Sequence, residues 1–282
     1  MPFVTVNDRS LYYFLRRPEV SNETLTLVFI PGLGSSSSFY ATIIPYLVEA
    51  GFTCLSIDTH GSGLSAYTGQ QTSMKSIAHD VTAVLSSLDI SPDRTVAVGH
   101  SMGGMVVGEL AAKLPLRGAV LIGPVEPSPQ AAEVFSKRME AVRKNGMEIM
   151  ADTIPAAATG SKSTPTHRAF IRALLLAQDP KGYASLCRAI ADAERPPYSR
   201  ATCPVLAIVG EEDKTAPAEG VRNILQSWNG PRDITSLPRV GHWHCIEAAE
   251  EVRSTVLDFV GQVLGFKGKY SSNRSTEYDI GS

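Results

Sequence analysis

The chain has 282 residues, of which 43% are hydrophobic and 19% are charged, and its formal net charge is -2. This composition is ordinary for a globular protein, allows one large α/β domain or two smaller ones, and gives no basis for a nucleic-acid or membrane partner. No apolar run approaches the roughly 18 residues of a membrane span, and the first residues lack the order of a secretory signal. We therefore expect a cytoplasmic protein.

Short β-branched apolar runs alternate with longer amphipathic segments, which predicts strand-helix-strand units and a mostly parallel sheet. The expected strands are residues 4–6, 11–14, 25–30, 53–57, 95–98, 119–122, 205–209 and 233–237. The expected helices of the same region are residues 38–50, 73–88, 102–114, 218–226 and 248–264. This pattern predicts a sheet of about eight strands flanked by helices, with the first two strands forming an antiparallel hairpin.

The alternation stops between residues 128 and 200, where helical patterns occupy 130–144, 167–177 and 181–194. A helical cap inserted after the sixth strand is therefore expected. Within it, IPAAATGSKSTP at residues 154–165 is small, polar and punctuated by Pro and Gly, which predicts a mobile loop. The expected domains are an α/β core of residues 1–127 and 201–266, the cap at 128–200, and a disordered tail at 267–282.

The four cysteines, Cys54, Cys187, Cys203 and Cys245, have no C-x-x-C spacing. Cys54 and Cys203 lie in or beside apolar runs typical of buried strands. We therefore expect reduced thiols and no metal site.

The segment GHSMG, from Gly99 to Gly103, fits the pattern G-x-S-x-G between a predicted strand and a predicted helix. In this pattern a sharp turn holds the serine hydroxyl above the carboxyl edge of the sheet. Glycines flank the serine because a β-carbon there would collide with the turn. Ser101 is therefore the predicted nucleophile, and the alternative is a glycine-rich turn in which Ser101 only caps the helix.

A serine hydroxyl needs a neighbouring base, and that base needs a group that fixes its tautomer. His242 follows the last predicted strand and precedes the last helix, at the same edge of the sheet as Ser101. His242 is therefore the predicted base, with His244 as its close alternative. His100 should point elsewhere, because the side chains of neighbouring residues diverge at such a turn.

The third member should be a carboxylate at another strand end. GEEDKTAP follows the seventh predicted strand and supplies Asp213, while its neighbours Glu211 and Glu212 are expected to stay solvated. The resulting chain order of Ser, Asp and His is the one expected for this type of sheet. Glu126, which follows the sixth predicted strand, is the alternative acid.

A tetrahedral intermediate also needs hydrogen-bond donors for its oxyanion. The backbone amide of Met102, at the start of the helix after the serine, is one predicted donor. The second is the amide of Leu33 in the loop PGLGSSSS, where Gly32 and Gly34 let the backbone approach the site and a substrate.

Five stretches, PGLGS, IDTHGSGLS, GHSMGG, GEEDKTAP and GHWHCIE, occur in an order and spacing that resemble the α/β-hydrolase superfamily from about residue 11 to 264. The resemblance implies Ser101, Asp213 and His242 as nucleophile, acid and base, with the amides of Leu33 and Met102 as oxyanion donors. A serine at the turn sets the chain apart from haloalkane dehalogenases and epoxide hydrolases, which carry an aspartate there. In the family the oxyanion loop usually begins His-Gly, whereas here it begins Pro-Gly.

Residues 179–217 are most similar to 3-oxoadipate enol-lactonases and their relatives. This resemblance implies a serine hydrolase that cleaves a small carboxylic ester or lactone through an acyl-enzyme, without metal or organic cofactor. We expect the cap to cover Ser101 with apolar side chains that contact the substrate, from Met139, Ile149, Phe170, Leu174 and Leu175. The protein is expected to be a monomer or a homodimer.

Two other functions use the same residues. One is a ligand receptor that keeps the fold and turns over very slowly. The other is an enzyme that hydrolyses carbon-carbon bonds or transfers acyl groups.

Overall fold

A computed structural model describes residues 2–19 and 25–265. Eight strands of these residues form one sheet in the order β1-β2-β4-β3-β5-β6-β7-β8. The strands are β1 (Phe3–Val6), β2 (Arg9–Arg16), β3 (Thr26–Ile30), β4 (Thr53–Ile57), β5 (Thr95–His100), β6 (Gly118–Ile122), β7 (Val205–Gly210) and β8 (Arg232–Leu237). The predicted tail at 267–282 lies outside the described residues.

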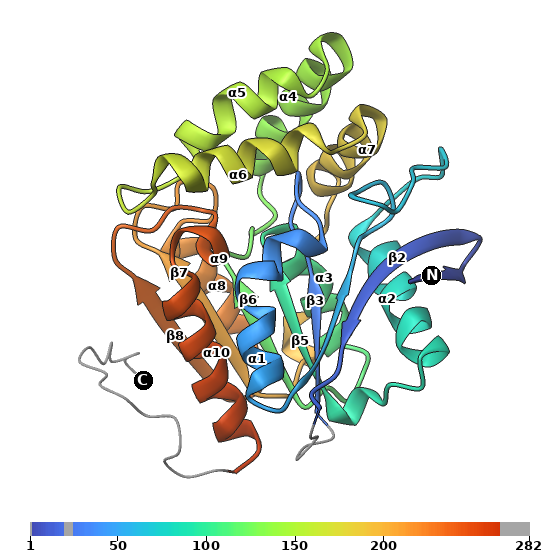
Figure 1. Ribbon diagram of the computed structural model, residues 1–282, viewed down its shortest axis with the longest axis vertical. Helices are drawn as coiled ribbons and strands as arrows, with labels where there is room; N and C mark the ends of the chain where they lie inside the picture. The colour runs from blue at the N-terminus through green and yellow to red at the C-terminus, as the bar shows by residue number, and fades with distance from the viewer. Residues whose placement is uncertain (1, 20–24, 266–282) are drawn as a thin grey trace.

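The sheet is antiparallel only at its first edge, where β1 pairs with β2 and β2 pairs with β4. All other neighbours run parallel. Asn7 and Asp8 join β1 to β2 with φ angles of 49° and 59°, as a two-residue turn with two left-handed positions requires. The expected eight-stranded, mostly parallel sheet with an initial hairpin is therefore confirmed (Figure 1).

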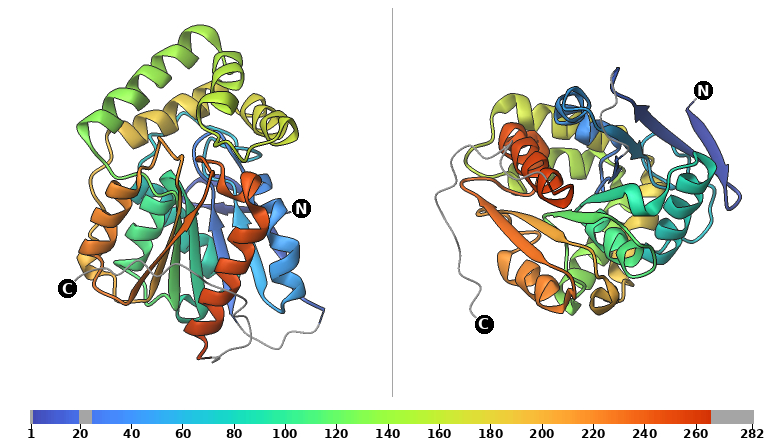
Figure 2. Two further views of the ribbon diagram at one scale, coloured as in Figure 1. Left: turned by 90° about the vertical axis from the view of Figure 1, so that its left-hand side faces the viewer. Right: turned by 90° about the horizontal axis from the view of Figure 1, so that it is seen from below.

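Helices cover both faces of the sheet (Figures 1 and 2). α1 (Ile44–Glu49) and α10 (Ala249–Val263) lie on one face, and α2 (Met74–Ser87), α3 (Met102–Ala111) and α8 (Ala218–Ser227) lie on the other. The central strands β3, β5, β6 and β7 are buried along their whole length, as expected for parallel strands covered on both faces. Their carboxyl ends are thereby fixed in one rigid row.

Four helices follow β6 and stand above the carboxyl ends of the strands (Figure 1). They are α4 (Pro129–Asn145), α5 (Glu148–Ala157), α6 (Pro165–Leu176) and α7 (Pro180–Ala191). Many contacts join α4 to α7 and α5 to α6. The expected helical insertion after the sixth strand is confirmed.

The predicted mobile loop at residues 154–165 is wrong in its first part, because α5 continues through Pro155 to Ala157. The part that follows is held by the core. Gly160 N donates to Glu247 Oε2, and a β-carbon at Gly160 would lie only 2.4 Å from Arg239 O. Residue 160 is therefore a glycine because two backbone segments approach each other closely there, and not because the loop must move freely.

The single helix expected at residues 38–50 is two shorter ones, a 3-10 helix (Ser37–Thr42) and then α1. Pro45 lies in the first turn of α1. A proline ring clashes with the carbonyl four residues before it, so a continuous helix could not pass through this position. Two further 3-10 turns (Pro92–Arg94 and Tyr198–Arg200) and the short α9 (His244–Glu247) complete the described elements.

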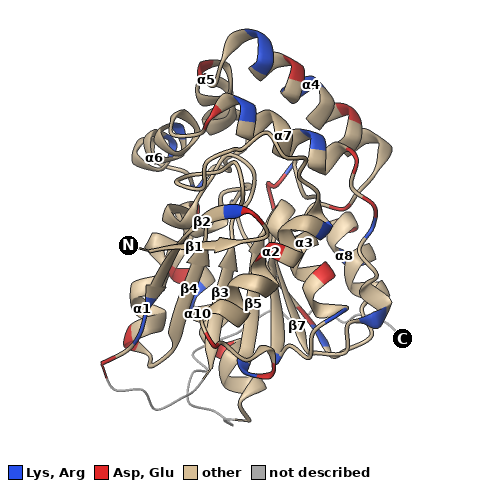
Figure 3. Cartoon of the chain, turned by 90° about the vertical axis from the view of Figure 1, so that its right-hand side faces the viewer, with Lys and Arg blue, Asp and Glu red and all other residues tan. Residues whose placement is uncertain are grey.

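Acidic and basic side chains are interspersed over the outer helices and loops (Figure 3). All four cysteines are buried and free. Among residues 2–19 and 25–265, no helix has the length and apolar character needed to cross a membrane. The same residues contain no group of three or more His, Cys, Asp or Glu side chains that could hold a metal ion.

Candidate active site

Ser101 occupies the tip of a sharp turn between β5 and α3. Its φ of 55° and ψ of -117° lie in a region that non-glycine residues rarely adopt. A β-carbon at Gly99 would lie 2.2 Å from Gly103 O, and one at Gly103 would lie 2.2 Å from Ile30 O. Both glycines of the G-x-S-x-G pattern are thus required by close backbone contacts, and the strained serine is held at the carboxyl edge of the sheet.

Three residues from separate strand ends meet at this turn. His242 Nε2 lies 2.9 Å from Ser101 Oγ, and His242 Nδ1 lies 2.8 Å from Asp213 Oδ2. All three side chains are buried. The structure thus brings the three predicted residues together in one hydrogen-bonded chain, named here the Ser101–His242–Asp213 cluster.

The Asp213 carboxyl is held in its charged form. Its Oδ1 accepts hydrogen bonds from the backbone amides of Thr215 (2.8 Å) and Ala216 (2.9 Å). Burial alone would raise the pKa of Asp213, but His242 and the other donors outweigh it and lower the pKa to about 2. Because a carboxylate can only accept, His242 Nδ1 carries the proton and Nε2 is left with a lone pair for the Ser101 hydroxyl.

The alternative base and acid lie elsewhere. His244 Nε2 is 3.9 Å from Asp213 Oδ2, and its Nδ1 contacts His242 O rather than Ser101. Glu126 accepts from Asn223 Nδ2 and pairs with Arg195 at 3.3 Å. The structure therefore favours His242 over His244 and Asp213 over Glu126.

The helix and the loop that carry the predicted oxyanion donors lie beside Ser101. Met102 is the first residue of α3, where N–H groups have no partner within the helix. The loop that carries Leu33 turns through a hydrogen bond from Ser35 N to Gly32 O. A β-carbon at Gly32 would lie 2.9 Å from Ser101 Cβ, so only glycine lets this loop approach the serine so closely.

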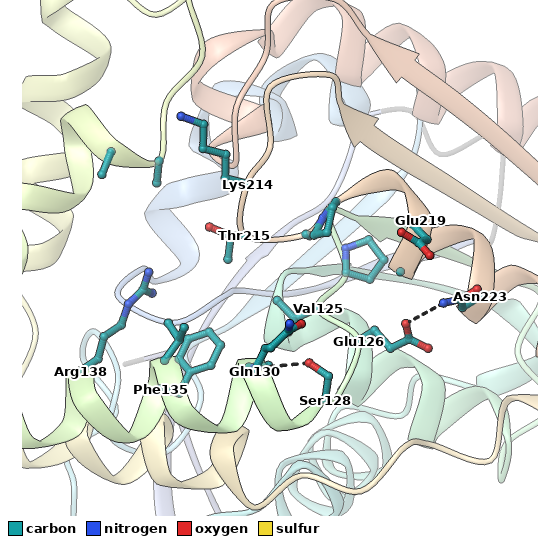
Figure 4. Close-up of a pocket in the computed structure, with 18 of the residues that line it drawn as sticks. Val125, Glu126, Ser128, Gln130, Phe135, Arg138, Lys214, Thr215, Glu219 and Asn223 are labelled. Atoms are coloured by element: carbon teal, nitrogen blue, oxygen red, sulfur yellow. Dashed lines mark hydrogen bonds between the residues drawn. The ribbon is translucent and has the colours of Figure 1, made fainter.

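A cavity of about 550 Å³ lies between the helical insertion and the loops after β6 and β7 (Figure 4). Its wall includes Val125, Ala158 and Thr215. Val125 N donates to Ser101 O, Ala158 O accepts from His242 N, and Thr215 N donates to Asp213. The cavity therefore lies behind residues that are hydrogen-bonded to each member of the cluster, while Ser101, His242 and Asp213 are not among its lining residues.

The apolar residues expected to contact a substrate do not line this cavity. The lining of the cavity contains Phe135 and Ile154 but none of Met139, Phe170, Leu174 and Leu175, which pack in a large apolar cluster shared by the insertion and the core. Ile149 is 37% exposed and does not line this cavity. Leu175 does reach the oxyanion loop, since a β-carbon at Gly34 would lie 2.6 Å from its Cδ2.

Two residues of the site were not predicted from the sequence. Arg138 of α4 lines the cavity with its guanidinium 5.1 Å from the centre of the Phe135 ring. Glu247 is buried and accepts hydrogen bonds from the backbone amides of Gly160, Gly241 and Trp243. Glu247 could have been found from the sequence, because it is the acid that ends the segment GHWHCIE. Nothing in the sequence distinguishes Arg138 from the other charged residues of its helix.

The buried His244 makes the stability depend on pH. Burial lowers its pKa to about 4, against 6.5 for an exposed imidazole. Between these values the unfolded chain binds more protons than the folded one, so the free energy of unfolding falls as the pH drops from 6.5 towards 4. Replacing His244 by Asn should reduce this fall by on the order of 3 kcal/mol, measured by urea unfolding at both pH values. An unchanged pH dependence would contradict a neutral, buried His244.

Residues 27–255 match the model of the Alpha/beta hydrolase family. The curated protein 3-oxoadipate enol-lactonase 2 of Acinetobacter baylyi is 31% identical over 203 residues, which cover 69% of this chain and 74% of that protein. A non-heme haloperoxidase of Rhodococcus erythropolis is 31% identical over 167 residues, which cover 54% of this chain and 58% of that protein.

Among solved structures, the enol-lactonase from Burkholderia xenovorans superposes with a TM-score of 0.82 at 27% identity. The match covers 92% of this chain and 99% of that one. The family match, the strand order and the insertion after β6 all agree with the resemblance seen in the sequence. The chain belongs to the alpha/beta hydrolase family.

Proposed function

We propose that this protein is a serine hydrolase that cleaves a small carboxylic ester or lactone with the Ser101–His242–Asp213 cluster as its catalytic triad. The observation that carries the proposal is the pair of contacts through His242, 2.9 Å to Ser101 Oγ and 2.8 Å to Asp213 Oδ2, at a strained turn. A serine used only as a helix cap needs neither the base nor the buried acid behind it.

The reaction follows from the positions of the protons. His242 Nε2 takes the hydroxyl proton as Ser101 Oγ attacks the carbonyl carbon, and the oxyanion accepts from the Leu33 and Met102 amides. The imidazolium then gives its proton to the departing alkoxide, which in a lactone stays attached to the acyl group. Water attacks the acyl-enzyme, His242 takes its proton, and that proton returns to Ser101 Oγ as the acid leaves. Asp213 stabilises the transient imidazolium throughout.

Size and chemistry of the cavity support a small substrate. The cavity beside the cluster measures about 550 Å³, which is room for a compact ester or lactone, and its walls combine Phe135 and Ile154 with two cations, Arg138 and Lys214, and two acids, Glu126 and Glu219. Two of the similar proteins are named as enol-lactonases, and their similarity to this chain supports a lactone as the substrate.

Arg138 favours a substrate that carries a carboxylate. Its guanidinium lies over Phe135 and beside the Tyr183 hydroxyl. Within the described residues it takes part in no ion pair. Tyr183 in turn packs against the oxyanion loop, since a β-carbon at Gly34 would lie 3.2 Å from its ring. We infer that Arg138 would receive a carboxylate carried by the substrate.

Replacing Arg138 by Gln should raise KM for a carboxylate-bearing ester by roughly 10- to 100-fold, because a hydrogen bond to a charged group is lost. The neutral methyl ester of the same compound should be hydrolysed almost as before. Arg143→Gln, an exposed change on the same helix, is the matched control. An equal change in KM for both substrates in Arg138→Gln would show that Arg138 does not recognise the substrate carboxylate.

The functional proposal is tested by steady-state kinetics on a panel of lactones and short esters. Continuous turnover with release of the free acid is the expected result. One burst of product followed by silence would favour a receptor with very slow turnover. Products that contain a transferred acyl group, or that result from cleavage of a carbon-carbon bond, would show that the reaction is not ester hydrolysis.

A further inference from the structure

The backbone carbonyl of His242 is held by two other histidine rings. His100 Nε2 lies 2.8 Å from His242 O, and His244 Nδ1 lies 2.9 Å from the same oxygen. His100 comes from the end of β5, directly before Ser101, while His244 begins α9. The two contacts therefore reach one oxygen atom from different elements.

The protonation of both rings follows from these contacts. A carbonyl oxygen can only accept, so His100 carries its proton on Nε2 and His244 carries its proton on Nδ1. Burial lowers the pKa of both rings and keeps them neutral. The remaining nitrogens, His100 Nδ1 and His244 Nε2, have no hydrogen-bond partner in the described part of the chain. The Nε2 atom of neutral His244 lies 3.9 Å from Asp213 Oδ2, so it does not compete with His242 for a hydrogen bond to that oxygen.

The rest of the backbone around His242 is also fixed. His242 N donates to Ala158 O at 2.8 Å, and the amides of Gly241 and Trp243 both donate to the Glu247 carboxylate. One hydrogen bond would be enough to satisfy the buried carbonyl. A second donor from a different direction adds a restraint on the rotation of the peptide, and hence on the origin of the imidazole.

His100 also links the two halves of the site. Its ring stacks on Phe39 with centroids 4.3 Å apart. On its other edge, a β-carbon at Gly32 would lie 2.7 Å from His100 Nδ1. The imidazole thus fills the space between the oxyanion loop and the His242 carbonyl. The position of the His100 ring therefore determines the distance between His242 and the loop that carries the predicted oxyanion donor Leu33.

We propose that His100 and His244 are positioning residues, whose two N–H groups clamp the His242 carbonyl and hold the imidazole of His242 in line with Ser101 Oγ and Asp213 Oδ2. The inference rests on the proposed function, because it assigns the clamp to a reaction in which His242 moves protons. Errors of about 1 Å in such alignment can cost on the order of 100-fold in rate.

Matched pairs of variants separate the donor from the volume of the side chain. Glutamine at position 100 can place an N–H where His100 Nε2 lies, whereas methionine fills similar space without a donor. At position 244, asparagine can replace the Nδ1–H of His244, and leucine has nearly the same shape without it. The pairs are thus His100→Gln against His100→Met and His244→Asn against His244→Leu.

The measurements are the rate of inactivation by a serine-directed phosphonate, and kcat and KM for a neutral ester. We expect His100→Met and His244→Leu each to lower the inactivation rate and kcat by roughly 10- to 100-fold while KM changes little. The Gln and Asn variants should stay near the wild-type rates. Equal losses within a pair would show that packing matters and the donor does not, and unchanged rates in the Met and Leu variants would also overturn the clamp.

A measurement on the unmodified protein covers the case in which a variant does not fold. Long-range nitrogen-proton NMR spectra of the histidine side chains distinguish the two neutral tautomers. We expect His100 as the Nε2–H form and His244 as the Nδ1–H form, and either ring in the other tautomer would overturn the proposal. Failure of the wild-type protein to react with the phosphonate would instead contradict the proposed function itself.

Discussion

Replacing Ser101 by Ala should lower the turnover of p-nitrophenyl acetate by about four to six orders of magnitude, the range seen when the nucleophile of a serine hydrolase is removed. The β-carbon and the turn remain, but the atom that attacks the carbonyl is gone. His242 would then have water as its only proton donor in the site, without the alignment that a bonded hydroxyl provides. Initial rates measured with both proteins at equal concentration give the comparison.

Ser87→Ala is the matched control, because Ser87 is exposed at the end of α2, away from the strand ends that form the site. Its rate should equal that of the unmodified protein. Melting temperatures of the two variants would show that the Ser101 change acts on chemistry and not on folding. A Ser101→Ala protein with the original turnover would remove Ser101 from the mechanism.

Asp213→Asn should lower kcat by about 10⁴-fold. An asparagine amide at this position can donate to His242 Nδ1, which favours the tautomer that has no lone pair for Ser101. The charge that stabilises the imidazolium is lost at the same time. The pKa of Asp213 is lowered to about 2, so the carboxylate is fully charged at neutral pH. Removal of this charge should therefore lower kcat at neutral pH.

Glu126→Gln is the decisive comparison, since Glu126 also follows a strand and is only partly buried. Its carboxylate pairs with Arg195 and Asn223, so its removal should change the rate far less than Asp213→Asn does. The two variants are compared at one pH with one ester. A large loss for Glu126→Gln beside a small loss for Asp213→Asn would assign the acid to the strand before the insertion.

The residues at strand ends could be predicted from the sequence because each has a local signal. Ser101 stands between glycines after a β-branched run, and Asp213 and His242 each follow an apolar strand. In a parallel sheet the carboxyl ends of all strands meet at one edge, so residues far apart in the chain can be placed together without a structure.

Other features depend on contacts that no local pattern records. Arg138 lines the cavity only because of the way α4 packs on α7, and Gly160 is needed only because another backbone passes beside it. His100 was expected to point away from Ser101, and the partner that it meets, the carbonyl of His242, lies 142 residues further along the chain. Tertiary packing thus decides which neighbours of the motifs take part in the site.

Glu247 connects the helical insertion to the base. Its Oε2 binds Gly160 N from the insertion and Gly241 N from the loop of His242. Glu212 adds a second link, since it accepts from Ser161 N and Ser161 Oγ. The insertion is therefore tied by hydrogen bonds to the loop that carries His242 and to the loop after β7.

Covalent labelling tests the central claim most directly. The protein is incubated with a serine-directed phosphonate, and the modified peptide is identified by mass spectrometry. One phosphonyl group per chain, located on Ser101 and absent in Asp213→Asn over the same time, is the expected result. No adduct, or an adduct on another residue while Ser101 stays free, would contradict the assignment of Ser101 as the nucleophile.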